Sequence, residues 1–291
     1  MGVSGQPILV TGATGNTGSA LVELLLRRGL PLRVMVRREG DAARFDAARV
    51  SVTVADFDDA QSLAAAMAGA GRAYLVTPSS EKAEAQQVRF AEIAARSGVA
   101  QLVVLSQFAA DEAAPARFLR WHGAVERQIR ELEIGYTFVR PNLYFQGVLA
   151  FAGSIAAGNR FFAPIGDARV SAVDVRDIAA VAAAALTEPG HEGRTYTITG
   201  PGAITHHDIA AALSAALGRE ITFVDAPPDV VAENLRGVLP PWQISGLLED
   251  YAHYARGEAA AVYPTVAQVT GQQPRDIGQF AHDYAQAFTR G

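Results

Sequence analysis

The feature that most constrains this sequence is a glycine-rich turn near the N-terminus, between a short apolar run and an amphipathic segment. Gly12, Gly15 and Gly18 recur at intervals of three residues. The first gap is one residue wider than in the ordinary dinucleotide fingerprint. After a strand and before a helix, such glycines permit a tight turn, let a pyrophosphate approach the backbone and pack the helix against the strand. The run therefore predicts a nucleotide-binding strand–turn–helix, and outside that context it would indicate only a tight turn.

Short β-branched runs alternate with longer Ala- and Leu-rich segments through the first 140 residues. This alternation predicts βαβ units around a parallel sheet. The first helix carries Leu21, Leu24 and Leu25 on one face and is expected to end near Gly29. The strands are expected near residues 8–11, 32–36, 50–55, 73–77, 102–106 and 136–140.

The rhythm of the sequence changes after Pro141, where a helical stretch precedes a run punctuated by Gly and Pro over residues 158–166. The later sequence is mostly helical and is interrupted near residues 221–224. The fold class expected is α/β, a Rossmann-type doubly wound parallel sheet with a smaller C-terminal α/β lobe. Residues 1–150 are expected to form the NAD(P)-binding domain. Residues 151–291 are expected to form mainly a substrate-binding lobe, with residues 170–200 returning to the Rossmann core.

Composition narrows the class of protein further. The 291 residues include no cysteine, which excludes disulfides and thiolate chemistry and fits a cytoplasmic location. The formal net charge is -5 with no basic run, which argues against a nucleic-acid partner. Neither an export signal nor a membrane span is expected, because the longest apolar stretches fall far short of the roughly 20 residues that cross a bilayer.

Two arginines stand where this fold reads the adenosine ribose. In NAD-selective folds an acidic residue follows the second strand, about 20 residues beyond the glycines. Here Arg37 and Arg38 occupy that place, and a guanidinium can bind a 2′-phosphate through charge-assisted hydrogen bonds. The expected cofactor is therefore NADP(H), although Glu39 weakens this reasoning and two merely solvated arginines are the alternative.

Acidic residues follow the third expected strand. Asp56 is expected to lie near the adenine, whereas Asp58 or Asp59 is expected to cap the next helix by accepting backbone N–H bonds. Asp174 and Asp177 are interpreted as a structural pair at a helix start. His206 and His207 precede Asp208 at another helix start, and since no metal-binding spacing surrounds them, no metal site is expected.

Taken together, the sequence resembles the NmrA-like group of atypical short-chain dehydrogenase/reductases, which includes NAD(P)H quinone oxidoreductases, triphenylmethane reductases and redox-sensing regulators. The resemblance runs nearly end to end and implies an extended Rossmann core with a small substrate lobe. It rests on the run from Thr11 to Gly18, on Asp56 with Asp59, on His122 to Glu126, on Tyr136 to Pro141, on Val173 to Ala179 and on Tyr196 to Pro201.

The sequence departs from catalytic short-chain dehydrogenases at their Tyr-x-x-x-Lys pair, which supplies a proton to a carbonyl oxygen. Lys82 is the only lysine, and Pro78 stands four residues before it, so the pair cannot exist here. The resemblance places Phe118 and His122, on a helix expected over residues 116–132, at the Tyr and Lys positions. His122 is expected either to face the nicotinamide ribose or to be an ordinary core residue.

The candidate site follows from the strand ends and from the resemblance. Ser106 is either a site residue or a turn hydroxyl, and Asn142 and Tyr144 are expected to line a pocket. The catalytic candidates are Ser106, His122 and Tyr144. The cofactor-binding candidates are Thr11, Gly12, Thr14, Gly15, Asn16, Thr17, Gly18, Arg37, Arg38, Asp56, Thr77, Ser106 and His122.

Two functions from different classes fit these residues. The first is an oxidoreductase that passes hydride from NADPH to a quinone-like or other conjugated small-molecule electrophile, without a tyrosine acid. The second is a non-catalytic NADP(H)-binding redox sensor that acts through a protein partner, because a Rossmann fold alone does not establish catalysis. The substrate and the oligomeric state, including a homodimer, stay open.

Overall fold

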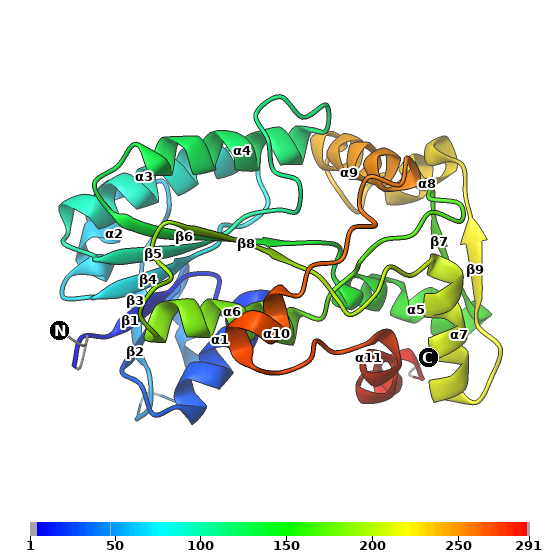
Figure 1. Ribbon diagram of the computed structural model, residues 1–291, viewed down its shortest axis with the longest axis horizontal. Helices are drawn as coiled ribbons and strands as arrows, with labels where there is room; N and C mark the ends of the chain where they lie inside the picture. The colour runs from blue at the N-terminus through cyan, green and yellow to red at the C-terminus, as the bar shows by residue number, and fades with distance from the viewer. Residues whose placement is uncertain (1–4, 47, 290–291) are drawn as a thin grey trace. The chain divides into compact units, whose positions relative to one another are not determined.

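The computed structural model describes residues 5–46 and 48–289, and within them the main element is a seven-stranded sheet (Figure 1). The strand order is β3-β2-β1-β4-β5-β6-β8, and each neighbouring pair from β3 to β6 is parallel. The order reverses at β1, which defines a doubly wound sheet. The strands are β1 Ile8–Val10, β2 Leu32–Val36, β3 Ser51–Val54, β4 Arg72–Leu75, β5 Gln101–Leu105, β6 Gly135–Pro141 and β8 Arg194–Ile198.

The observed strands confirm the predicted fold class, an α/β fold with a doubly wound parallel sheet. Each of the first six lies within two residues of its expected bounds. Most of the residues in β1, β2, β4, β5 and β6 are buried, and buried parallel strands are continuous apolar runs, whereas β3 is a partly exposed edge strand rich in β-branched residues. No strand was expected over β8. Its first residues, Arg194 and Thr195, are exposed. An edge strand of this kind lacks the apolar run that marks the central strands.

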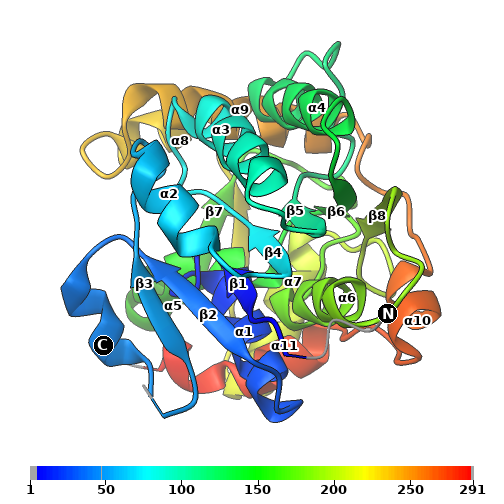
Figure 2. The same ribbon diagram turned by 90° about the vertical axis from the view of Figure 1, so that its left-hand side faces the viewer.

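Helices cover both faces of this sheet. Figures 1 and 2 show α2, α3 and α4 over one face and α1 and α6 over the other. The face below α2, α3 and α4 holds a large apolar cluster that includes Leu63, Phe90, Ile129 and Phe138. The elements are α1 Asn16–Arg27, the 3-10 helix η1 Glu39–Arg44, α2 Ala60–Met67, α3 Ala83–Arg96, α4 Arg117–Arg130 and α6 Val175–Thr187.

The chain divides into two compact units, each built from separate stretches of sequence. The first unit contains the chain up to Glu112, Trp121–Arg140 and Ile178–Tyr196. The second contains Ala113–Arg120, Pro141–Asp177 and the chain from Thr197 onward. The first unit thus holds β1 to β6, most of α6 and most of β8.

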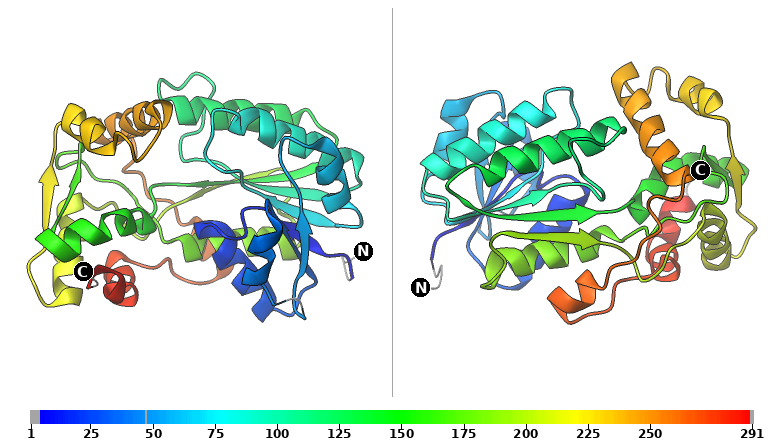
Figure 3. Two further views of the ribbon diagram at one scale, coloured as in Figure 1. Left: turned by 180° about the vertical axis from the view of Figure 1, so that it is seen from behind. Right: turned by 45° about the horizontal axis from the view of Figure 1, so that its top comes forward.

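The second unit contains a parallel pair of strands, β7 and β9, with α7 packed beside it (Figure 3). This pair makes the C-terminal part α/β, as expected, although β7 lies within the run that Gly and Pro punctuate. No helix in the described ranges is both long and apolar enough to span a bilayer. The elements are η2 Phe145–Phe151, α5 Ala152–Gly158, β7 Arg160–Ala163, α7 His206–Leu217, β9 Thr222–Asp225, α8 Pro228–Leu235, α9 Pro241–Ala255, α10 Thr265–Thr270, α11 Ile277–Asp283 and η3 Ala285–Phe288.

An aromatic cluster surrounds His206 at the start of α7. The centroid of the His206 ring lies 5.1 Å from that of Phe223 and 6.2 Å from that of Phe161. Thr205 and Asp208 form a reciprocal capping box that fixes this helix start. Burial lowers the pKa of His206 to about 4, and His207 adds to this shift while Asp225 opposes it. The imidazole is therefore a neutral core residue.

The lowered pKa of His206 predicts a loss of stability in acid. Between pH 6.5, the ordinary pKa of histidine, and about pH 4, His206 is protonated in the unfolded chain but neutral in the folded chain. The free energy of unfolding should therefore decrease as the pH is lowered through this window, by roughly 3 kcal/mol in total. Urea unfolding at several pH values in the wild type and in His206→Phe measures the effect. In the variant, the number of protons taken up on unfolding in this window should be smaller by about one. Identical pH profiles in the two proteins would contradict the assignment.

Candidate functional site

Two glycines of the N-terminal turn are required by the fold itself. Gly12 has a φ of +58°, and a Cβ there would lie 2.4 Å from Val76 Cγ1. A Cβ on Gly18 would lie 2.2 Å from the Gly12 carbonyl oxygen, so only glycine lets the helix approach the turn. Both distances are far inside normal contact. These glycines shape the turn whether or not a ligand binds.

Gly15 differs, because the protein leaves its Cβ position almost open. Its backbone is extended, with φ −90° and ψ 179°, and the nearest atom to a Cβ would be the Gly12 carbonyl oxygen at 3.4 Å. Gly15 is also the N-cap of α1, where no side chain caps the helix and no acidic residue occupies the first turn. Uncapped N–H groups at a helix N-terminus bind phosphates. The turn therefore fits a dinucleotide.

Two threonine hydroxyls of the turn already have partners inside the protein. Thr11 Oγ1 accepts a hydrogen bond of 2.8 Å from the Val76 amide and lies 2.9 Å from the Val76 carbonyl oxygen, which ties β1 to β4. The Tyr74 hydroxyl donates to Thr17 Oγ1 at 3.1 Å. These contacts give both threonines a structural task, whereas Thr14 and Asn16 are exposed.

Five of the candidate positions, the first glycine of the turn among them, follow neighbouring strands at their carboxyl ends. Asp56 follows β3, Arg37 follows β2, Gly12 follows β1, Thr77 follows β4 and Ser106 follows β5. Because these strands are parallel, the five positions form a row along one edge of the sheet. Ligands of open α/β sheets bind outside this edge, at the point where the strand order reverses.

The residues at one end of this row are exposed. Across the described ranges, the guanidinium groups of Arg37 and Arg38 form no hydrogen bond or ion pair within the protein. The Asp56 carboxylate accepts the Asp58 amide at 2.9 Å in a local turn. Two adjacent guanidinium groups that form no ion pair suit a phosphate, and the role of Arg37 and Arg38 in binding one stays a prediction.

The acidic residues after Asp56 separate into two roles. Asp59 caps α2 by accepting the backbone amides of Gln61 and Ser62 at 2.9 and 3.3 Å, which confirms the predicted cap. Asp58 instead binds Lys82 at 3.1 Å. The hydrogen bond from Lys82 lowers the pKa of the Asp58 carboxyl. Lys82, the only lysine in the sequence, is thus paired with this carboxylate.

Ser106 is buried and hydrogen-bonded to Glu126, a residue for which the sequence predicted no role. Its Oγ donates to Glu126 Oε1 at 2.6 Å. Glu126 has no exposed surface and also accepts from Arg130 and from Arg140, the latter through two guanidinium nitrogens. The one proton of the Ser106 hydroxyl is therefore already donated in a hydrogen bond within the protein. The only sequence signal was the spacing, which places Glu126 four residues after His122 and four before Arg130 on one face of the helix.

His122 lies on α4 and is half-buried. Burial lowers the pKa of His122 to about 4, the Glu126 carboxylate opposes this shift, and Arg140 adds to it. The imidazole is therefore neutral near pH 7 and can donate one hydrogen bond and accept another, but it is not a ready acid. Phe118, four residues earlier, packs against Gly246 within the second unit.

Two further candidates, Asn142 and Tyr144, belong to the second unit. Asn142 is buried, and its amide donates to Ser171 Oγ and to the Ala259 carbonyl oxygen, both at 2.9 Å, and accepts from the Leu143 amide. These bonds use its polar atoms, so Asn142 holds backbone segments together rather than presenting a free amide. Tyr144 is half-buried and forms a β-bridge with Val173.

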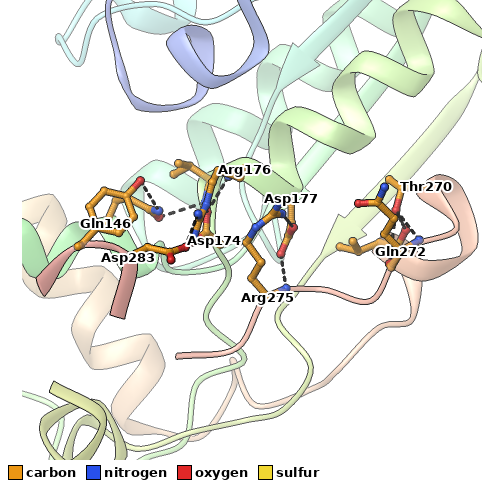
Figure 4. A network of polar contacts seen from close by, with 11 residues as sticks. Gln146, Asp174, Arg176, Asp177, Thr270, Gln272, Arg275 and Asp283 are labelled. Carbon is orange, nitrogen blue, oxygen red and sulfur yellow. Dashed lines mark hydrogen bonds and ion pairs between the residues drawn. The ribbon is translucent and has the colours of Figure 1, made fainter. Parts of the chain in front are cut away.

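Asp174 and Asp177 are structural, as predicted (Figure 4). Asp174 Oδ1 accepts the Arg176 backbone amide at 2.8 Å, and Arg176 in turn binds Asp283 at 2.6 Å. Asp177 accepts the Arg275 backbone amide at 2.7 Å and pairs with its guanidinium. Burial nevertheless raises the pKa of the Asp177 carboxyl. In the part of the chain that the structure describes, no three potential metal ligands lie together.

This sheet and its uncapped, glycine-lined helix start define a Rossmann-type dinucleotide-binding protein. The family model described as the NmrA-like family matches residues 4–278. The chain therefore belongs to the NmrA-like family.

Relatives of known function cover nearly the whole chain. An NAD(P)H azoreductase from Xenophilus azovorans is 34% identical, over 97% of this chain and 99% of the azoreductase. A (4-alkanoyl-5-oxo-2,5-dihydrofuran-3-yl)methyl phosphate reductase from Streptomyces griseus is 36% identical, with the same coverage of both chains. An NADPH-dependent quinone oxidoreductase from Escherichia coli, solved with NADPH, is 25% identical with a TM-score of 0.85, over 95% of this chain and 99% of that one.

Proposed function

We propose that this protein is an NADPH-dependent reductase that transfers hydride to a quinone-like or other conjugated small-molecule electrophile. The observation that carries the proposal is the turn at Gly15, where the fold leaves space and uncapped N–H groups for a pyrophosphate. Its relatives support the reaction class, since they are an azoreductase, a reductase of a dihydrofuranone phosphate and a quinone oxidoreductase.

The cofactor would lie along the row of strand ends. Arg37 and Arg38 would hold the 2′-phosphate, Asp56 the adenine, and the α1 N-terminus the pyrophosphate. Thr77, Ser106 and His122 would lie toward the nicotinamide end. Tyr144, a residue of the second unit, stays a catalytic candidate predicted from the sequence. When bound, NADPH supplies the hydride. Residues 1–150 would thus bind mainly cofactor and residues 151–291 mainly substrate.

We infer the acceptor class from the candidate residues of the first unit and from the residue at the tyrosine position, none of which offers a ready acid. His122 is neutral, the Ser106 proton is donated to Glu126, and Phe118 stands at the tyrosine position. An acceptor reduced here must therefore stabilise its own negative charge until water protonates it. A quinone does so by resonance, whereas a simple ketone would form an unstabilised alkoxide.

The proposed function predicts steady NADPH oxidation with quinones and no oxidation with simple ketones. The measurement is the loss of NADPH absorbance across a panel of quinones, azo dyes and ketones. Rapid ketone reduction would mean that another residue supplies a proton to the substrate oxygen. Tight NADPH binding without turnover by any acceptor would favour the redox-sensor alternative.

His122→Ala separates positioning from chemistry. Loss of a ribose contact should raise the KM for NADPH more than it lowers kcat, and a larger loss in kcat would contradict this role.

A further inference from the structure

The row of candidate residues continues by one strand beyond the proposed cofactor site. β6 neighbours β5, and the register pairs Leu105 with Val139, so Arg140 lies level with Ser106 at the carboxyl edge. The Ser106 amide donates to the Val139 carbonyl oxygen at 2.8 Å, which fixes the two strand ends together. If the cofactor spans β3 to β5, the next strand end lies beyond its nicotinamide. That is the place for the group accepting hydride.

A buried carboxylate holds Arg140 in a fixed orientation. Its Nε donates to Glu126 Oε1 at 2.7 Å and its Nη2 to Glu126 Oε2 at 2.5 Å, a bidentate pair. Within the described ranges the remaining nitrogen, Nη1, has no partner in the protein. The Glu126 side chain has no exposed surface, whereas that of Arg140 is 22% exposed. The guanidinium is thus anchored at one edge and reachable at another.

The charges around Glu126 do not cancel. One carboxylate faces two guanidinium groups, those of Arg130 and Arg140, so one positive charge is left over. His122, the other titratable group of α4 near this carboxylate, is neutral. A partly desolvated, pre-oriented guanidinium with a free donor edge binds oxyanions such as carboxylate, sulfonate or phosphate.

We propose that Arg140, positioned by Glu126, determines specificity by binding an anionic group of the acceptor through Nη1. The inference rests on the proposed function, since it concerns the acceptor of the same site. It assigns a substrate class, conjugated electrophiles that carry an oxyanion. The dihydrofuranone reductase among the relatives acts on a phosphate ester, a compound of this class.

A matched pair of acceptors tests the assignment. One is a naphthoquinone with a propionate side chain, and the other is its methyl ester. The saturated chain insulates the ring, so the two differ in charge and hardly in reactivity. The wild type should have the higher kcat/KM for the acid. Arg140→Met should reduce the acid-to-ester ratio by about 10-fold. Arg140→Lys, which keeps the charge but not the fork, should give an intermediate ratio.

Arg130→Met is the matched control, because Arg130 also binds Glu126 and the substitution removes the same charge. Its acid-to-ester ratio should stay within about twofold of the wild type. Equal losses in both variants, or an unchanged ratio in Arg140→Met, would overturn the assignment while leaving the reductase function intact. No NADPH oxidation with either acceptor would instead overturn the proposed function.

Two further measurements keep the comparison independent of turnover and of folding. Circular dichroism confirms that each variant is folded, and Arg140→Lys replaces Arg140→Met if the methionine variant is not. Calorimetry with naphthylpropionate, an unreactive carboxylate, compares binding to the NADP+-loaded protein. Affinity should fall by about 10-fold in the Arg140 variant but not in Arg130→Met. Equal affinity in wild type and Arg140 variant would again exclude the contact.

Discussion

Replacement of Gly15 by valine is expected to abolish NADPH binding while the chain stays folded. The extended backbone accepts any residue, and the nearest atom to the added Cβ lies 3.4 Å away. The side chain would nevertheless occupy the space that a pyrophosphate needs beside the helix N-terminus. Affinity for NADPH, measured by calorimetry, should fall at least about 100-fold, and stability should fall by only about 1 kcal/mol at the N-cap.

Substitutions at two other glycines serve as controls for Gly15→Val. Gly18→Ala forces a Cβ to within 2.2 Å of the Gly12 carbonyl oxygen, so it should destabilise the fold as well as weaken binding. Gly153→Val, in α5, makes the same chemical change where no atom lies within 4 Å, and should leave NADPH affinity unchanged. Undiminished binding in Gly15→Val would place the pyrophosphate elsewhere.

Arg37→Glu is expected to reverse or erase a preference for NADPH over NADH. In the wild type NADPH should bind about 10- to 100-fold more tightly, because charge-assisted hydrogen bonds to the 2′-phosphate have no equivalent in NADH. The variant places a carboxylate against that phosphate, and a carboxylate can instead accept the ribose hydroxyls of NADH. Calorimetric titration of both nucleotides into both proteins gives the comparison.

The control for Arg37 is Arg96→Glu, the same change of charge at the last residue of α3. The helix of a βαβ crossover runs back across the sheet, so its C-terminus lies at the edge opposite the strand ends. Cofactor preference should therefore be unchanged in Arg96→Glu. Equal affinities for NADH and NADPH in the wild type would refute the role of Arg37 and Arg38.

The sequence predicted the parallel sheet well because its central strands are buried on both faces and so appear as apolar runs. It did not predict β7 or β8. β8 begins with exposed polar residues at the sheet edge, and β7 lies between Gly158 and Gly166, where turn residues dominate the pattern. In both places pairing with a distant strand, rather than local sequence preference, sets the conformation.

The candidate site was predictable only where backbone geometry depends on residue type. Gly12 and Gly18 follow from steric limits that any sequence must obey. The partners of Ser106 were not predictable, because Glu126 and Arg140 come from a helix and a strand that meet only in the folded chain. Pairing of this kind decides whether a hydroxyl donates its proton to the protein or to a ligand.

The discontinuity of the first unit limits how this protein can be taken apart. The chain passes between the units after Glu112, Arg120, Arg140, Asp177 and Tyr196. An N-terminal fragment ending near residue 150 would lack all of α6, whose buried face includes Val181 and Leu186. It would also lack β8 and so leave β6 as an unpaired edge strand. Domain transplantation must therefore carry residues 178–196 together with the glycine turn. A chimera that joins the halves at residue 150 would inherit two incomplete cores.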